Sequence, residues 1–260
     1  MDAGPVGLIS IAAEAGCVGV CIFTHIPANV DKALFPVVDD GNKDEMLAAM
    51  RERYIAVSNV EFFPITADAE IADFCPGLAL GAELGAARAV CHIHDTQSER
   101  AVDMLGSLAD RASGYGLDLG LEFMGMTAGC RSLDRAVWFV DQVARPNLGI
   151  AIDMLHLVRT GGTAADVAAL ESRYFSYAQI CDGRGLHLSS DYMEEALGRE
   201  LPGDGDFPIQ AIIEALPHCC PLDVEVPSSK PAERNISMDE WAGEAISRSR
   251  ELIDRATSWR

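Results

Sequence analysis

The chain has few basic side chains for its size. Its 260 residues include 20 Lys and Arg against 40 Asp and Glu, which gives a formal net charge of −20 at pH 7. A surface this negative repels phosphate backbones, so we expect no nucleic-acid partner. No uncharged apolar run is long enough to cross a bilayer, and the start MDAGPVG lacks the basic stretch of a signal peptide. These absences favour a cytoplasmic protein without a membrane partner.

Two further absences limit the kind of site. The eight cysteines form no C-x-x-C pair and lie mostly within apolar runs, which favours buried, reduced thiols over disulfides or a zinc site. No G-x-G-x-x-G follows a strand-like segment, and the turn-rich loop PGDGD lacks the Lys-Ser/Thr of a Walker phosphate loop. No linker or low-complexity stretch divides the chain, so we interpret residues 1–260 as a single domain.

The sequence does contain a regular alternation of two kinds of segment. Short apolar and β-branched runs predict seven strands. They lie at residues 17–23, 55–63, 88–94, 118–123, 148–153, 175–181 and 222–226. Longer amphipathic stretches predict eight helices. They lie at residues 6–16, 42–54, 68–86, 99–116, 132–143, 164–172, 207–216 and 237–256.

This order of segments predicts the fold class. Strands that alternate with crossover-length helices indicate parallel βαβ units. Seven strands and eight helices, beginning with a helix, fit a (β/α)8 TIM barrel that lacks the first strand in this chain. A true seven-stranded barrel and an open doubly wound sheet are the competing architectures. For the barrel we expect a gap or an exposed sheet edge where a first strand would lie.

Polar side chains occupy one face of four successive predicted strands. Side chains alternate along a strand, and the apolar face of a barrel strand packs under helices. The polar face therefore points to the barrel axis. We expect four residues to converge there at one height, near the carboxyl ends of their strands: Glu122, Asp153, Gln179 and Glu225.

Three carboxylates and one amide in a confined space predict a cation. The carboxylates cannot all stay ionised together without one. Oxygen ligands favour Mg²⁺ or Mn²⁺, so we expect these four residues to bind one such ion. The alternative is that each acid pairs separately with an Arg or Lys. Basic residues are few, and none lies on the inward face of these four strands.

The second half of the chain resembles the xylose isomerase-like superfamily. The motifs GLEF, IDMLHLVRTGG, YAQICDG, RELPGDGDFPI and DVEVPS come in the order found in that group, over residues 119–228. The group includes sugar phosphate isomerases and epimerases, ketose 3-epimerases, inosose dehydratase and 3-dehydroshikimate dehydratases. In the ketose 3-epimerases the metal ligands are Glu, Asp, His and Glu. Here Gln179 stands at the histidine position, as it does in the 3-dehydroshikimate dehydratases.

The resemblance implies a reaction as well as a fold. A metal ion in such a site polarises a carbonyl, and the neighbouring C–H loses a proton to give an enediolate. Glu122 and Glu225 are implied to lie on opposite sides of the substrate and to act as bases. Return of the proton to the other face gives epimerisation, and its return to the next carbon gives isomerisation. Loss of a β-hydroxyl gives dehydration.

Further polar residues are candidates for substrate contact. His156 is either an acid–base group, a substrate donor or a structural loop residue. Arg199 in GRELPGDGDF suits a carboxylate or phosphate of the substrate, or is a solvated surface arginine. His94 lies near a strand end and shares a strand face with His92. Asp182 belongs to the motif YAQICDG.

We therefore predict a divalent-metal-dependent enzyme of the sugar phosphate isomerase/epimerase kind. Its substrate is expected to be a small polyhydroxy carbonyl compound, anionic because Arg199 would hold it. A 3-dehydroshikimate-type dehydratase, a nuclease of the endonuclease IV type and a non-catalytic sugar-binding barrel are the alternatives. Glu61 is a further strand-end candidate, and assembly into a homo-oligomer is left open.

Overall fold

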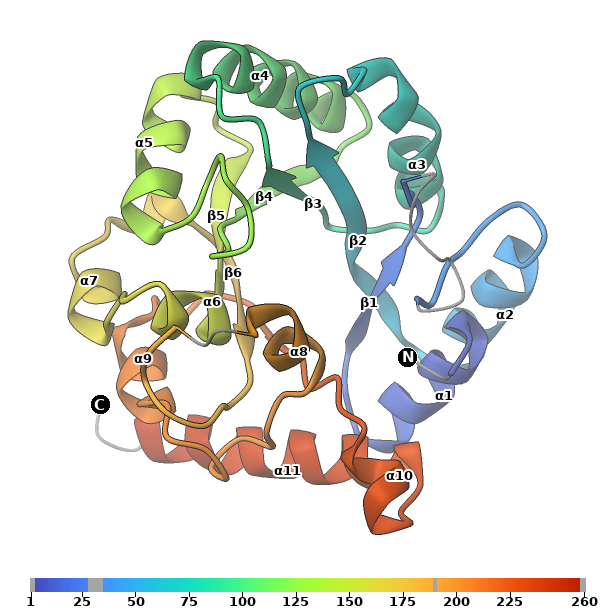
Figure 1. Cartoon of the computed structure of the whole chain (residues 1–260). Helices are drawn as coiled ribbons and strands as arrows, with labels where there is room; N and C mark the ends of the chain where they lie inside the picture. The colour runs from blue at the N-terminus through green and yellow to red at the C-terminus, as the bar shows by residue number, and fades with distance from the viewer. Residues whose placement is uncertain (1–2, 28–34, 189–190, 258–260) are drawn as a thin grey trace.

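The computed structural model describes residues 3–27, 35–188 and 191–257. Within them, seven parallel strands form one sheet in the order β1 to β7, and the sheet curls into a nearly closed barrel with helices outside it (Figure 1). The strands are Gly19–Phe23 (β1), Ala56–Ile65 (β2), Arg88–Ile93 (β3), Asp118–Glu122 (β4), Leu148–Asp153 (β5), Phe175–Ile180 (β6) and Leu222–Val224 (β7). The predicted barrel class is confirmed, and the doubly wound alternative is wrong.

The helices surround the barrel, and there are more of them than expected. Eight match the predicted segments: Pro5–Glu14 (α1), Lys43–Arg53 (α2), Ile71–Glu83 (α3), Ser98–Gly114 (α4), Leu133–Val143 (α5), Ala164–Ala168 (α7), Ile209–Ala215 (α9) and Met238–Thr257 (α11). The described residues form three more, at Met154–Arg159 (α6), Tyr192–Leu197 (α8) and Lys230–Arg234 (α10). The expectation of eight was wrong because helices of 5 or 6 residues are too short to show an amphipathic period. All three follow strand ends, on the side of the barrel where the polar residues lie.

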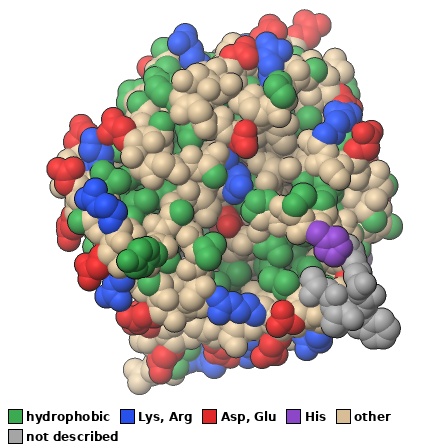
Figure 2. Space-filling model, turned by 180° about the vertical axis from the view of Figure 1, so that it is seen from behind, with side chains coloured by type: hydrophobic (Ala, Val, Ile, Leu, Met, Phe, Trp, Pro, Cys, Tyr) green, Lys and Arg blue, Asp and Glu red, His purple; other side chains and the backbone are tan. Residues whose placement is uncertain are grey.

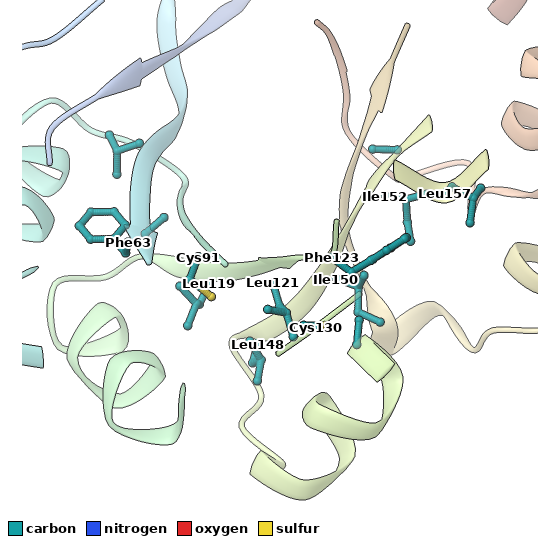
Figure 3. Close-up of a cluster of buried hydrophobic side chains, with 14 of the residues drawn as sticks. Phe63, Cys91, Leu119, Leu121, Phe123, Cys130, Leu148, Ile150, Ile152 and Leu157 are labelled. Carbon is teal, nitrogen blue, oxygen red and sulfur yellow. The ribbon is translucent and has the colours of Figure 1, made fainter. Parts of the chain in front are cut away.

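The outward faces of the strands pack under the helices. Leu119 and Leu121 of β4 are fully buried, as are Ile150 and Ile152 of β5. Figure 3 shows these side chains gathered between the strands and the neighbouring helices. Burying each such side chain contributes roughly 1.5–3 kcal/mol. This apolar layer stabilises the strands, and their opposite faces are left to carry polar side chains.

The polar residues of the inward faces share an end of the barrel rather than a row of the sheet. Asp153 pairs in register with Gln179. Glu122 instead pairs with the residue two positions before Asp153, and Glu225 lies two positions beyond the partner of Gln179. Strands of a barrel tilt, and such a stagger brings residues of successive strands to the same end of its axis. The expectation that the four residues lie at one height in the sheet is therefore wrong; they lie instead at one end of the barrel axis.

One large side chain fills the barrel interior beneath that end. Tyr177 of β6 is fully buried, and the Arg88 guanidinium lies 5.2 Å from the centre of its ring. Opposite it stands Gly120, where a Cβ would come within 3.2 Å of the tyrosine ring. The Tyr177 hydroxyl has no hydrogen-bond partner among the described residues. The ring therefore forms the floor of the space at the carboxyl ends of the strands.

The predicted sheet edge is present between β1 and β7. These strands end the sheet and do not pair with each other in the described parts of the chain. Asn59 Nδ2 of β2 donates a hydrogen bond to Asp223 Oδ2 of β7 at 2.5 Å, which links the two sides across the interior. Outside the barrel, α1 packs against α11. Side chains and helices thus hold together the part of the barrel where backbone pairing is interrupted.

The charges on the surface are mixed, and the cysteines are less buried than expected from the sequence. Apart from its grey part, the face in Figure 2 has acidic and basic side chains interspersed, with no broad basic patch. No helix in residues 3–27, 35–188 and 191–257 is long and apolar enough to cross a membrane. The eight cysteines are free, and three of them are buried: Cys91, Cys130 and Cys181.

Candidate active site

Glu122, at the end of β4, lies between two histidines. Its Oε2 atom is hydrogen bonded to His92 Nε2 of β3 at 2.7 Å, and its Oε1 atom lies 3.6 Å from His156 Nε2. Burial alone would lower the pKa of His92, but the hydrogen bond and charge of Glu122, with the charge of Glu61, raise it. This pairing fixes the direction of the Glu122 carboxylate.

Asp153, at the end of β5, has a partner for each oxygen. Its Oδ1 atom caps α6 by accepting the backbone N–H groups of Leu155 at 2.7 Å and His156 at 3.2 Å. Its Oδ2 atom accepts a hydrogen bond from Arg199 Nη1 at 2.6 Å. Burial would raise the pKa of Asp153, but the charges of Arg199 and His156 and these hydrogen bonds hold it below its usual range. The carboxylate is thus ionised although it is fully buried.

His156, in α6, is paired with a residue that the sequence did not indicate. Its Nδ1 atom lies 2.5 Å from the hydroxyl of Tyr192 in α8, and the two rings stack with their centres 5.7 Å apart. Burial lowers the pKa of His156 more than the nearby Asp153 and Glu122 raise it. A neutral imidazole with Nδ1 engaged by a hydroxyl can use Nε2, on the side of Glu122, to donate or accept a proton.

Gln179 and Glu225 form the third side of the site. Gln179 Nε2 donates to Glu225 Oε2 at 2.5 Å. The other amide atom, Gln179 Oε1, is buried and has no hydrogen-bond partner among the described residues. Arg199 Nη1 lies 3.3 Å from Glu225 Oε2, so this arginine stands between Glu225 and Asp153. Burial and the charges of Asp153 and Glu122 raise the pKa of Glu225 well above its usual range, although Arg199 opposes the shift.

These donors fit a divalent cation. One ligand atom from each of Glu122, Asp153 and His156 lies within 4.8 Å of the others, and all three residues are buried. The unpaired Gln179 Oε1 is a fourth candidate ligand atom, and it needs a hydrogen-bond donor or a cation because an unsatisfied buried acceptor costs about 1–3 kcal/mol. Three carboxylates against one arginine leave a formal charge of −2 in the cage, which a divalent ion would balance.

Comparison with known proteins identifies the fold family. A family model described as "Xylose isomerase-like TIM barrel" matches residues 9–252. The chain belongs to this family. No curated protein matches the sequence closely enough to be reported as a relative.

Solved structures of the xylose isomerase-like fold resemble the whole barrel. The IolI protein with a bound zinc atom has a TM-score of 0.76 and 18% identity, covering 96% of this chain and 91% of its own. A xylose isomerase domain protein from Alicyclobacillus acidocaldarius has a TM-score of 0.76 and 20% identity, covering 97% and 94%. D-psicose 3-epimerase from Clostridium cellulolyticum H10, solved with D-tagatose, has a TM-score of 0.71 and 16% identity, covering 95% and 93%. At these identities the resemblance shows the fold.

Two sequence-predicted substrate contacts lie in different surroundings within this family barrel. The Asp182 carboxylate accepts four backbone N–H groups, from residues 183, 203, 205 and 207, and thereby shapes the PGDGD loop. These four hydrogen bonds satisfy the buried Asp182 carboxylate without a bound substrate. His94 is exposed and lines an open hollow of about 920 Å³ together with Thr66 and Ser98, beside the strand ends. None of the cage residues lines this hollow, so contact of His94 with a substrate stays a prediction.

The arginines near the barrel mouth are engaged with carboxylates. Arg199 is buried and held by Asp153, so the reading of a solvated surface arginine is wrong. Arg159 is buried too and forms an ion pair with Glu195 at 2.7 Å. The expectation that the cage acids lack a basic partner is also wrong, because Arg199 arrives from a loop rather than from an inward strand face.

Three polar residues of the site had only weak signals in the sequence: His92, Tyr192 and Glu61. His92 was only one of two alternating histidines, and Tyr192 lies in a helix too short to predict. Glu61 of β2 accepts a hydrogen bond from the Cys21 thiol at 3.1 Å. Burial and the nearby charge of Glu122 raise the pKa of Glu61 to about 7. A carboxyl residue inside a predicted strand was the available signal for Glu61.

Proposed function

We propose that this protein is a divalent-metal-dependent enzyme that removes a proton next to a carbonyl of a small polyhydroxy compound, as isomerases and epimerases do. The observation that carries the proposal is the unbalanced cage. Asp153 and Glu225 share a single arginine, Glu122 lies between two histidines, and Gln179 Oε1 is buried without a partner among the described residues. Mn²⁺ or Mg²⁺ suits the oxygen donors, and His156 would suit Zn²⁺ as well. The bound ion would supply Lewis-acid polarisation of the carbonyl.

We propose a separate role for each residue of the cage, in ion binding, proton transfer or substrate contact. Glu122 and Glu225 are proposed to hold the ion together with Asp153 and Gln179, and to exchange the proton at the two faces of the substrate. His92 keeps the Glu122 carboxylate oriented through its 2.7 Å hydrogen bond. Neutral His156 is proposed to donate to, or accept from, a substrate hydroxyl through Nε2. Arg199 is proposed to contact an anionic group of the substrate.

Loss of a hydroxyl group is a second candidate reaction, a dehydration like that of 3-dehydroshikimate. The specific observation in its favour is the pair His156 and Tyr192, joined at 2.5 Å beside the cage. A hydroxyl leaving group needs an acid that protonates it: His156 Nε2–H would give its proton to the leaving oxygen while Nδ1 takes the proton of the Tyr192 hydroxyl, which solvent then restores. Gln179, with its resemblance to the 3-dehydroshikimate dehydratases, points the same way. This reaction would begin with the same proton removal.

The test combines metal content with turnover. Protein purified without chelator is analysed for metals, reloaded with Mn²⁺, Mg²⁺ or Zn²⁺, and assayed with ketoses, inososes and dehydroshikimate in D₂O. Epimerisation or isomerisation introduces solvent deuterium at carbon, whereas dehydration gives a product with a new double bond and stronger ultraviolet absorbance. Asp153→Ala should hold much less ion than the parent. If it retains as much Mn²⁺ as the parent, the proposed cage is wrong.

A further inference from the structure

Arg199 contacts two of the cage carboxylates. The side chain is buried, and its Nη1 atom lies 2.6 Å from Asp153 Oδ2 and 3.3 Å from Glu225 Oε2. Its Nε atom donates to the carbonyl of Ala196 in α8, and its backbone N–H donates to the carbonyl of Pro227 after β7. The guanidinium is therefore held from both sides and directed at two of the carboxylates that are proposed to bind the ion.

Asp153 has little capacity left for a second cation. Its Oδ1 atom already accepts two backbone N–H groups of α6, and its Oδ2 atom is the one bound by Arg199. A divalent ion that binds Asp153 must replace the arginine contact or share the oxygen with it. Sharing places like charges a few ångströms apart in a buried site, where their repulsion is weakly screened.

Resting on the proposed metal cage, we infer that Arg199 is a resident counter-ion that competes with the divalent ion. Without metal, the guanidinium satisfies Asp153 and Glu225, which would otherwise be buried carboxylates without a positive partner. With metal, the ion takes over part of that task, and the guanidinium becomes available to an anionic or hydroxyl group of the substrate. Arg199 thus sets the affinity of the cage for its ion and couples ion binding to substrate binding.

The inference predicts effects of opposite sign in one variant. In Arg199→Leu, the metal-free protein should melt at a lower temperature than the parent, because two carboxylates lose their counter-ion. The same variant should bind Mn²⁺ about tenfold more tightly or better, because the competing charge is gone. An arginine that only supports the loop would lower stability and metal affinity together.

The experiment needs no substrate. Chelator-treated proteins are compared for melting temperature, and Mn²⁺ is titrated while the free ion is followed by electron paramagnetic resonance. Arg159→Leu is the matched control, since Arg159 is also buried and ion-paired but with Glu195. It should lower the melting temperature and leave Mn²⁺ affinity unchanged. Arg199→Lys keeps the charge but reaches fewer oxygens, so it should bind Mn²⁺ more tightly than the parent and less tightly than Arg199→Leu.

The outcomes separate this inference from the proposed function. Mn²⁺ binding by the parent with equal or weaker binding by folded Arg199→Leu would overturn the counter-ion role alone. If Arg199→Leu does not fold, Arg199→Lys decides in the same way. Absence of divalent-ion binding by the parent would overturn the proposed function and this inference with it.

Discussion

The two ends of the barrel interior both carry carboxylates, an amide and an arginine, but they differ in how fully these groups are paired with one another. At the amino ends of the strands, Asp223 accepts a hydrogen bond from Asn59, and Asn59 accepts one from Arg88 at 2.8 Å. One carboxylate therefore stands near one arginine, with an amide linking them. At the carboxyl ends, Asp153 and Glu225 share one arginine, Glu122 lies between two histidines, and an amide oxygen is left without a partner among the described residues.

The difference separates a network whose hydrogen bonds are complete within the protein from one that is left incomplete. A buried polar group is inexpensive when its partners are all supplied by the protein, and the Arg88 network meets that condition. In the cage at the other end, Gln179 Oε1 has no such partner among the described residues, and this is one reason for proposing a cation there. In barrels of this kind the carboxyl ends of the strands carry the active site, and the amino ends contribute to stability. Substitutions at the two ends should therefore affect different measurements.

The largest effect is expected at Glu122. Glu122→Gln removes the negative charge of one cage carboxylate and weakens the hydrogen bond to His92, while the size and shape of the side chain are kept. We expect kcat to fall by about a thousandfold, the scale for loss of a charged group at the reacting centre. Steady-state kinetics with the best substrate measures this, and the melting temperature should change little. If the variant keeps a tenth or more of the parent's kcat, Glu122 does not take part in the proton transfer.

The next largest effect concerns Arg199 and the charge of the substrate. Arg199→Leu should lower kcat/KM for an anionic substrate by ~2–4 kcal/mol at saturating metal, because a charged hydrogen bond is lost. A neutral ketose should lose far less. Parallel kinetics with a charged and a neutral substrate measure the difference. Equal losses for both would show that the anionic group is held elsewhere.

At the amino end the effect should appear in stability instead. Arg88→Met keeps the apolar stem over Tyr177 but leaves Asn59 Oδ1 and Asp223 without their cation. We expect the free energy of unfolding to fall by ~1–3 kcal/mol, with metal affinity and kcat unchanged. Urea denaturation and Mn²⁺ titration of the same preparation check both parts. A loss of metal affinity here would mean that the two ends are not independent.

The smallest effect is expected between the two ends. Tyr177→Phe removes a buried hydroxyl that has no partner among the described residues, while the ring that fills the interior is retained. We expect the free energy of unfolding to stay level or to rise by up to ~1 kcal/mol. Urea denaturation of this variant alone is sufficient. A drop of more than that amount would reveal an ordered water or ion bound to the hydroxyl.

Much of this arrangement was predictable because strands alternate their side chains. The period of two assigned Leu119 and Ile150 to the helix-covered face, and Glu122, Asp153 and Gln179 to the interior. The order of strands and helices then implied a parallel barrel, whose carboxyl ends meet. The metal-binding role of these residues remains a prediction from their charge and convergence.

The partners of these residues were not predictable from the same pattern. Arg199 reaches the cage because α8 and the pairing of residues 182 and 200 fold the loop back over the strand ends. A loop's path depends on such distant contacts, which leave no periodic trace in the sequence. Tyr192 was not predicted for the same reason. The hydrogen bond of His92 was not predicted because the choice between His92 and His94 depends on the register of β3 with β4.

The Tyr177 ring across the barrel also limits how this protein can change. A Cβ at Gly120 would lie only 3.2 Å from that ring, so the glycine and the tyrosine constrain each other, and the floor stays in place as long as Tyr177 is kept. A longer or bulkier substrate must extend outward, past His94 and the loops that carry α6, α8 and α10. Divergence in substrate range within such a barrel is therefore expected to proceed by replacement of loops, while the floor and the strand-end acids are inherited together.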